Sequence, residues 1–153
     1  VISDVRRRGY GTVWVVGTSR GAISAVNAAS RLTGAAAPDG LVLTSALMLG
    51  NPGSRVAWVA HSVFDLPLEA IRQPTLVVGH AEDKCARSPA NLMDRIIART
   101  NGAREQVVTV TGGPGMAGTS SSAACEGRSP HGFIEQEAEV AAGIIRFIRG
   151  ENY

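Results

Sequence analysis

One stretch near the beginning of the chain, residues 13–29, restricts the possible folds more than any other. It starts with Val13-Trp14-Val15-Val16, an apolar run rich in β-branched residues that predicts a short buried strand. The run passes directly into a Gly-x-Ser-x-Gly turn, residues 17–21, and then into small and apolar residues that predict a helix. A turn this tight brings the strand and the helix very close together, so a helix must pack directly on a sheet.

The turn has the spacing and the context of a nucleophile elbow. Its central residue, Ser19, would project its hydroxyl out of the fold at the expense of a strained backbone conformation. Gly17 and Gly21 fit the flanking positions, where we expect any Cβ to collide across the turn. The N–H groups that begin the helix could stabilise an oxyanion, with the Arg20 N–H as the expected first donor. A structural glycine turn is the alternative, whereas a phosphate-binding loop is excluded because Gly-Lys-Ser/Thr and Gly-x-Gly-x-x-Gly are both lacking.

Three further apolar runs, residues 41–45, 74–80 and 106–111, predict strands. The first two show no alternation, which is typical of parallel strands covered on both faces. Helices are expected at residues 1–10, after Ser88-Pro89, which has the pattern of a helix start, and from residue 134 onward. Strands that alternate with helices predict an α/β fold: a mostly parallel sheet with helices on both faces, forming a single domain over residues 1–153.

The bulk properties argue against two classes of partner. The formal net charge of the 153 residues is only +2, which gives no strong electrostatic case for nucleic acid or an anionic membrane. The short basic run Arg6-Arg7-Arg8 fits a solvated helix end better than a nucleic-acid patch. No apolar stretch is long enough to span a bilayer.

A nucleophilic serine needs a base, and three histidines are available. His131 lies in a loop rich in glycine and serine just before the last helix, so we expect its ring to swing freely toward Ser19. His80 closes a strand and is the second candidate. His61 lies inside a connecting segment with no strand end beside it.

The base in turn needs a carboxylate to orient it. Asp83 directly follows a predicted strand, at the carboxyl edge where sites of parallel sheets assemble. Its neighbour Glu82 is the second candidate, while Asp94 fits a solvated helix position and Asp65 fits a turn. The order Ser19, Asp83, His131 is the serine–acid–histidine order of hydrolases that use this elbow.

These segments together resemble the C-terminal half of an α/β-hydrolase: the elbow at residues 17–21, the strand at 74–80 with Asp83, and Ser129-Pro130-His131-Gly132-Phe133. The similarity is greatest to bacterial serine hydrolases of the esterase-like and dienelactone-hydrolase-like kinds. It implies Ser19 as nucleophile, His131 as general base and acid, and Asp83 as the orienting carboxylate. It further implies cleavage of small-molecule carboxylic esters through an acyl-enzyme, with neither a metal nor an organic cofactor.

The chain departs from that pattern because the strands that normally precede the elbow are lacking. Those strands carry the loop that supplies the second oxyanion donor, and their absence leaves the elbow strand as an exposed edge. We therefore expect either that the chain is the C-terminal portion of a longer protein, which its start in mid-helix favours, or that a second chain covers the edge. A non-catalytic or partly active binding or assembly module, and an acyltransferase on the same fold, remain alternatives to an esterase.

The two cysteines, Cys85 and Cys125, are either unrelated thiols or a disulfide. Cys85 follows Asp83 by two residues and Cys125 precedes His131 by six, so a bridge becomes reasonable if those two loops meet. A bridge would indicate a periplasmic or secreted protein, and free thiols a cytoplasmic one.

Overall fold

The structure, a computed structural model, describes residues 1–56 and 59–153 in full and residues 57–58 without their side chains. Its centre is a sheet of four parallel strands in the order β1-β2-β3-β4. The strands are β1 (Trp14–Thr18), β2 (Gly40–Thr44), β3 (Thr75–His80) and β4 (Glu105–Val110). The α-helices are α1 (Ile2–Arg7), α2 (Gly21–Arg31), α3 (Asp94–Ile97) and α4 (Glu137–Ile148). Short 3-10 turns connect them: η1 (Gly34–Ala36), η2 (Ala57–Ala60), η3 (Val63–Asp65), η4 (Leu68–Ala70), η5 (Ala90–Leu92), η6 (Ala123–Cys125) and η7 (Pro130–Gly132).

The two central strands are buried along their whole length, as their unbroken apolar runs predict. The edge strands β1 and β4 are only partly buried. The register places Thr18 of β1 opposite Thr44 of β2, so the carboxyl ends of these two strands lie level. Loops that follow the strands therefore meet along one edge of the sheet.

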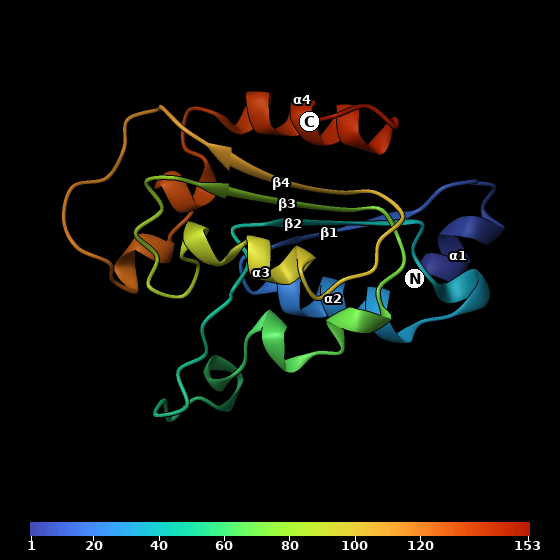
Figure 1. Cartoon of the computed structure of the whole chain (residues 1–153), viewed down its shortest axis with the longest axis horizontal. Helices are drawn as coiled ribbons and strands as arrows, with labels where there is room; N and C mark the ends of the chain where they lie inside the picture. Colours follow the sequence, from blue (N-terminus) through green and yellow to red (C-terminus); the bar gives the residue numbers. More distant parts are fainter.

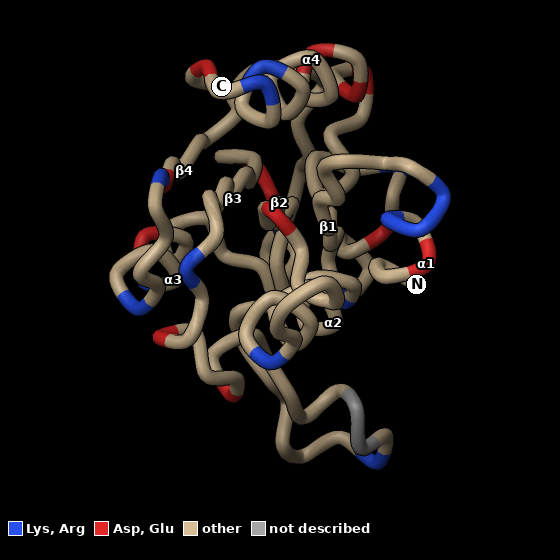
Figure 2. Tube along the Cα trace, turned by 90° about the vertical axis from the view of Figure 1, so that its right-hand side faces the viewer, with Lys and Arg blue, Asp and Glu red and all other residues tan. Residues whose placement is uncertain are grey.

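Helices cover both faces of the sheet, which confirms the predicted α/β architecture. Helices α2 and α3 lie on one face and α4 lies on the other (Figures 1 and 2). The α2 face is closed by small side chains, Ala22, Ala25 and Ala29, packed with Leu41 and Leu43 of β2. The α4 face is closed by a second cluster comprising Val42, Leu76, Val78, Val110, Phe133, Val140 and Phe147.

The helix start predicted at Ser88-Pro89 is wrong. The Ser88 hydroxyl does not cap a helix but donates a 3.0 Å hydrogen bond to the carbonyl of Ser45. Pro89 is extended, at ψ 120°, and the following residues form the turn η5 before the single turn of α3. A tertiary contact with the end of β2 has taken the side chain that would otherwise cap the helix.

The outer edge of β1 is open: within the residues that the structure describes, no strand pairs with β1 on the side away from β2. Val16 of this strand is 54% exposed. A pocket of about 220 Å³ lies beside it, lined on the sheet side by Val16, Thr18 and Thr44 and on the helix side by Phe133 and residues of α4. The sheet thus lacks the strands that precede the elbow in the fold predicted from the sequence.

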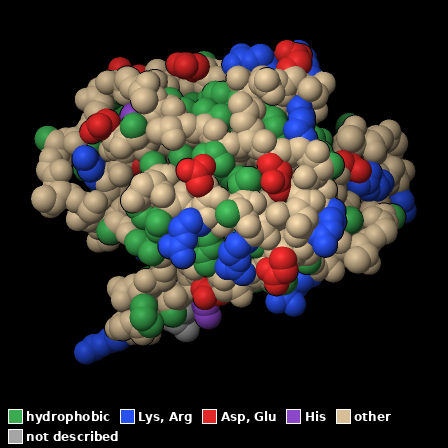
Figure 3. Space-filling model, in the orientation of Figure 1, with side chains coloured by type: hydrophobic (Ala, Val, Ile, Leu, Met, Phe, Trp, Pro, Cys, Tyr) green, Lys and Arg blue, Asp and Glu red, His purple; other side chains and the backbone are tan. Residues whose placement is uncertain are grey.

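Figure 3 shows basic and acidic side chains interspersed on one face. The basic run at the end of α1 is partly neutralised, because Arg6 pairs with Asp39 at 2.7 Å and Arg7 and Arg8 share the carboxylate of Asp4. None of the helices in the described part of the chain has the length and apolarity needed to cross a membrane.

Candidate active site

Ser19 occupies the sharp turn between β1 and α2, and its backbone lies in the left-handed region at φ 53°. The strained conformation predicted for the centre of the elbow is therefore confirmed. A Cβ on Gly17 would lie 2.6 Å from the carbonyl oxygen of Gly21 and 2.7 Å from Cα of Ala22, so only glycine fits there. The same prediction for Gly21 is wrong, because a Cβ on Gly21 meets no described atom within 4 Å. Gly21 is exposed to solvent, so of the two glycines only Gly17 is required by the close approach of strand and helix.

Three side chains from distant parts of the sequence form a continuous hydrogen-bonded chain beside this turn. The distance from Ser19 Oγ to His131 Nε2 is 2.9 Å, and His131 Nδ1 lies 2.8 Å from Asp83 Oδ2. The side chain of His131 is 3% exposed and that of Asp83 is 1% exposed. In this arrangement the carboxylate faces one ring nitrogen and the hydroxyl faces the other, which holds the imidazole in the tautomer that can accept the hydroxyl proton.

Asp83 is fixed by the loop that leaves the carboxyl end of β3. Its second carboxylate oxygen, Oδ1, accepts a 2.8 Å hydrogen bond from the N–H of Cys85. Its own N–H donates to the carbonyl of His80, the last residue of β3. Because both carboxylate oxygens are occupied, the side chain has one orientation relative to the imidazole.

His131 does not swing freely, contrary to the expectation from its glycine-rich surroundings. Its N–H donates to Ser129 Oγ at 3.1 Å, and its carbonyl accepts a 2.7 Å hydrogen bond from Ser45 Oγ. Ser129 in turn donates to the carbonyls of Ala124 and Glu126. The loop is built from small residues, but its hydrogen bonds fix the backbone that carries the imidazole.

The other candidate bases have structural positions. His80 is buried at the end of β3, where Nδ1 accepts from the N–H of Glu82 and Nε2 lies 2.9 Å from Gln136 Oε1. It therefore ties β3 to the segment that precedes α4. His61 has an exposed side chain, and its Nδ1 lies 3.9 Å from Asp65 Oδ2.

The other candidate acids also lie outside the hydrogen-bonded chain. Glu82 is exposed and pairs with Lys84 at 3.7 Å. Asp65 caps a turn, because its carboxylate accepts from the backbone N–H of Ser62. Asp94 is exposed at the start of α3.

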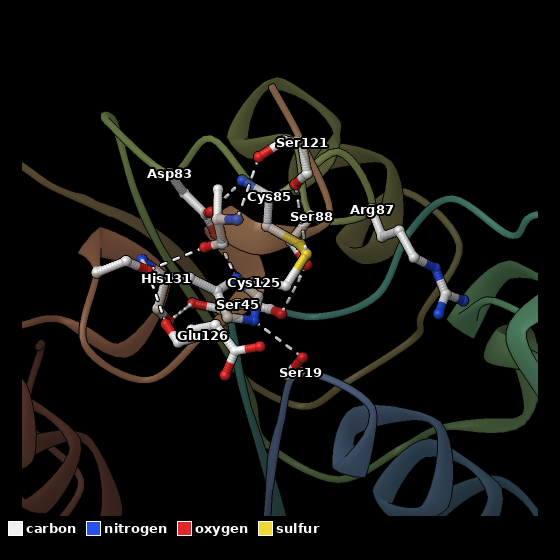
Figure 4. Close-up of a disulfide and its surroundings, with 12 residues drawn as sticks. Ser19, Ser45, Asp83, Cys85, Arg87, Ser88, Ser121, Cys125, Glu126 and His131 are labelled. Carbon is white, nitrogen blue, oxygen red and sulfur yellow. Dashed lines mark hydrogen bonds and ion pairs between the residues drawn. A yellow bond between two sulfur atoms is a disulfide. The ribbon is translucent and has the colours of Figure 1, made fainter. Parts of the chain in front are cut away.

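A disulfide joins Cys85 to Cys125 and links the loop of Asp83 to the loop that leads to His131 (Figure 4). The two loops are also held together by backbone hydrogen bonds, from Ser121 N–H to the Lys84 carbonyl and from Ala86 N–H to the Ser121 carbonyl. The ligand-type atoms of Asp83, Cys85 and His131 lie within 4.8 Å of one another. This set is a poor fit for a metal ion, because the sulfur is in a disulfide and cannot act as a thiolate ligand.

A pocket of about 570 Å³ opens beside the residue that follows the serine. One wall is the exposed side of α2, and the opposite wall is the segment around η3; its lining residues are Arg20, Ile23, Ser24, Asn27, His61, Ser62, Asp65 and Leu66. Met48 and Leu49, which lie a few residues after β2, are not among the residues that line it. Met48 is buried in the core and Leu49 is 43% exposed.

Arg87 is hydrogen-bonded to the segment that leads from β2 to the pocket wall at His61. Its guanidinium donates to the carbonyls of Leu49 and His61. Burial, together with the nearby positive charge of Arg20, lowers the pKa of Arg87 from its ordinary value. Arg20 itself stands at the N-cap position of α2, directly after Ser19.

Comparison with solved structures shows where this fold occurs. A structure from work on LipS and LipT, two metagenome-derived lipolytic enzymes, superposes with a TM-score of 0.64 at 13% identity, covering 97% of this chain and 69% of that one. The monoacylglycerol lipase of Paleococcus ferrophilus superposes with a TM-score of 0.51 at 16% identity, covering 72% of this chain and 62% of that one. The fold is that of the α/β-hydrolases.

At these identities the likeness shows the fold alone. No protein-family model matches the sequence, and no curated protein matches it either. The α/β-hydrolase fold of this chain spans about two thirds of the length of the lipolytic structures that it resembles.

Proposed function

We propose that this chain is a serine hydrolase that cleaves carboxylic esters through a Ser19–His131–Asp83 triad. The observation that carries the proposal is the hydrogen-bonded chain from the half-buried Ser19 Oγ through both nitrogens of the buried His131 to the buried carboxylate of Asp83. A structural histidine needs no nucleophilic hydroxyl at 2.9 Å on a strained turn, whereas covalent catalysis needs that pairing.

In the first half of the reaction, Ser19 Oγ bonds to the ester carbonyl carbon while its proton passes to His131 Nε2. Collapse of the tetrahedral intermediate breaks the bond to the alkoxy oxygen, and the alcohol leaves with that proton. In the second half, water gives a proton to His131 and attacks the acyl-enzyme, releasing the acid and restoring the Ser19 hydroxyl. Asp83 holds the imidazole in place and stabilises the imidazolium that forms in each half.

The N–H of Arg20 is the first donor that we assign to the oxyanion, since it directly follows the nucleophile at the start of α2. The pocket beside Arg20, at about 570 Å³, is of a size that takes a small ester. The similar lipolytic structures support an ester over an amide as substrate. An acyltransferase would use the same triad, with another acceptor in place of water.

A fluorophosphonate probe tests the proposal, because it reacts with a serine only when the serine is activated. We expect the wild-type chain to be labelled, and Ser19→Ala and His131→Ala to show no labelling while circular dichroism shows them folded. Ser30→Ala, on α2 with its hydroxyl turned to the Asn27 carbonyl, is the control that keeps labelling. A folded wild-type chain that is not labelled would contradict the proposal and would favour a non-catalytic binding or assembly module.

The open edge of β1 leads to a second proposal, that additional polypeptide covers it. An exposed apolar edge strand invites pairing with another strand, and the lipolytic structures contain further chain outside the match. The covering segment would be either a preceding part of the same protein or a second chain. Light scattering on the purified 153 residues tests the point: a stable monomer that does not aggregate would contradict it.

We also propose that the protein works in an oxidising compartment, as a periplasmic or secreted protein, because its disulfide lies beside the active site. Thiol titration after denaturation without reductant tests this proposal. Two free thiols in protein prepared from its native compartment would contradict it.

A further inference from the structure

Ser45, the residue that directly follows β2, has an unusual backbone in a buried position. It is 2% exposed, and its φ of 44° lies in the left-handed region, which is uncommon for a residue other than glycine. Such strain persists only where the surroundings hold it in place, and it gathers at functional sites. The strain at Ser19 belongs to the elbow, but the strain at Ser45 has no part in the mechanism above.

The side chain of Ser45 reaches the loop that carries the base. Its hydroxyl donates a buried 2.7 Å hydrogen bond to the backbone carbonyl of His131, 86 residues further along the chain. The backbone of Ser45 is fixed on both sides, because its N–H donates to the Val78 carbonyl and its own carbonyl accepts from Ser88 Oγ. Figure 4 shows Ser45 within the group formed by Ser19, Asp83 and His131.

Thr44, the residue before Ser45, is hydrogen-bonded to the nucleophile Ser19. The carbonyl of Thr44 accepts a 2.9 Å hydrogen bond from the N–H of Ser19. Thr44, the last residue of β2, therefore binds the nucleophile, and the next residue, Ser45, binds the base. Because β2 is a central strand that is buried throughout, it provides a rigid reference for the distance between Ser19 Oγ and His131 Nε2.

We propose that Ser45 is a positioning residue, whose hydroxyl holds the His131 loop against β2 so that Nε2 stays within hydrogen-bonding distance of Ser19. The catalytic consequence rests on the serine-hydrolase function proposed above. Ser129 and the disulfide still anchor the loop when the Ser45 hydroxyl is removed, so the fold survives and the imidazole loses only its alignment. A misplacement on the order of 1 Å costs about a hundredfold in rate, so we expect labelling to slow by about ten- to a hundredfold.

Two substitutions separate positioning from a general contribution to stability. Ser45→Ala removes the hydroxyl but keeps the Cβ and its strain, whereas Ser45→Gly removes the hydroxyl and relieves the strain. Thr75→Val is the matched control, since Thr75 is fully buried and donates to the Gln73 carbonyl at 3.0 Å at the opposite end of the sheet. The fluorophosphonate labelling rate and the urea midpoint are measured for each protein.

We expect both Ser45 variants to be labelled about ten- to a hundredfold more slowly than wild type, even though Ser45→Gly is the more stable of the two. Thr75→Val should be destabilised but labelled at the wild-type rate. Labelling rates that follow stability across the set, or a Ser45→Gly variant labelled as fast as wild type, would overturn the positioning role.

A proton resonance tests the same role without any reaction. We expect the Nδ1 proton of His131, hydrogen-bonded to Asp83, to give a signal displaced to low field in the proton spectrum of the wild-type chain. We expect this signal to shift or broaden in both Ser45 variants and to stay unchanged in Thr75→Val. If wild type is not labelled but the signal responds to Ser45, the hydrolase function fails and the positioning role stands. A signal identical in wild type and the Ser45 variants refutes the positioning role, whatever the labelling shows.

Discussion

Removal of the Cys85–Cys125 disulfide has a consequence whose size follows from the structure. The bridge closes a loop with a sequence separation of 40 residues. The chain-entropy relation for a loop of that length gives a stabilisation of about 4 kcal/mol at room temperature. We therefore expect the double variant Cys85→Ala/Cys125→Ala to lose about 4 kcal/mol in the free energy of unfolding, a large share of the stability of a domain this size.

Urea denaturation followed by tryptophan fluorescence measures this loss. The bridge also keeps the unfolded chain compact, so the dependence of the unfolding free energy on urea should be steeper in the double variant. The comparison is therefore made on free energies extrapolated to water rather than on midpoints. Wild type treated with dithiothreitol should match the double variant, and the same treatment should leave the double variant unchanged.

The candidate active site should respond as well, because the bridge joins the loop of Asp83 to the loop that leads to His131. We expect fluorophosphonate labelling of the double variant to slow even in the absence of urea, where the chain is still folded. A loss below about 1 kcal/mol, in a wild-type protein shown to contain the bridge, would refute the loop-closure reasoning. Unchanged labelling would show that the backbone hydrogen bonds between the two loops hold them without the bridge.

Three other substitutions give further predictions. Gly17→Ala should lower the free energy of unfolding by about 3 kcal/mol, because its Cβ would lie 2.6 Å from a backbone carbonyl oxygen that cannot move aside. Gly21→Ala, with open space at its Cβ, is the control. Equal stabilities of the two variants in urea would contradict this account. Asp83→Asn should slow fluorophosphonate labelling by about a thousandfold or more, with little change in the circular dichroism spectrum. Glu82→Gln, at an exposed neighbouring position, should keep the wild-type labelling rate. Labelling of Asp83→Asn at the wild-type rate would remove Asp83 from the triad. Burial raises the pKa of Tyr153, whose hydroxyl is buried with no hydrogen-bond partner among the described residues, so the folded state favours the neutral phenol. Its contribution to stability is complete below pH of about 10 and is lost as the pH rises through the folded-state pKa, so alkaline denaturation curves should show a smaller decline for Tyr153→Phe than for wild type, and identical curves would count against it.

The sheet could be predicted because its signals are local. The runs at 41–45 and 74–80 contain no polar alternation, and both form strands buried on two faces. The elbow was also visible, since strand, Gly-x-Ser-x-Gly and helix follow one another without interruption. The helix start at Ser88-Pro89 failed for the opposite reason: the Ser88 hydroxyl bonds to Ser45, 43 residues away, and local pattern carries no information about that partner.

Some features of the candidate site also follow from the local sequence, whereas others depend on tertiary packing. The glycine at position 17 and the strain at Ser19 follow from the turn itself, whereas the open space at Gly21 depends on how α2 lies against the sheet. The hydrogen bond from Ser45 to His131 had no signal in the sequence, because a serine at the end of a strand is common and its partner lies 86 residues away.

The sequence by itself determined the order of the chemical groups along the chain: a hydroxyl after β1, a carboxylate after β3 and an imidazole before α4. Only the tertiary structure decided that they meet, across separations of 112 and 48 residues. The physical reason is that parallel pairing sets the strand ends level at one edge of the sheet. The disulfide and the hydrogen bonds of Ser129 and Ser45 then fix loops whose own composition leaves them many conformations.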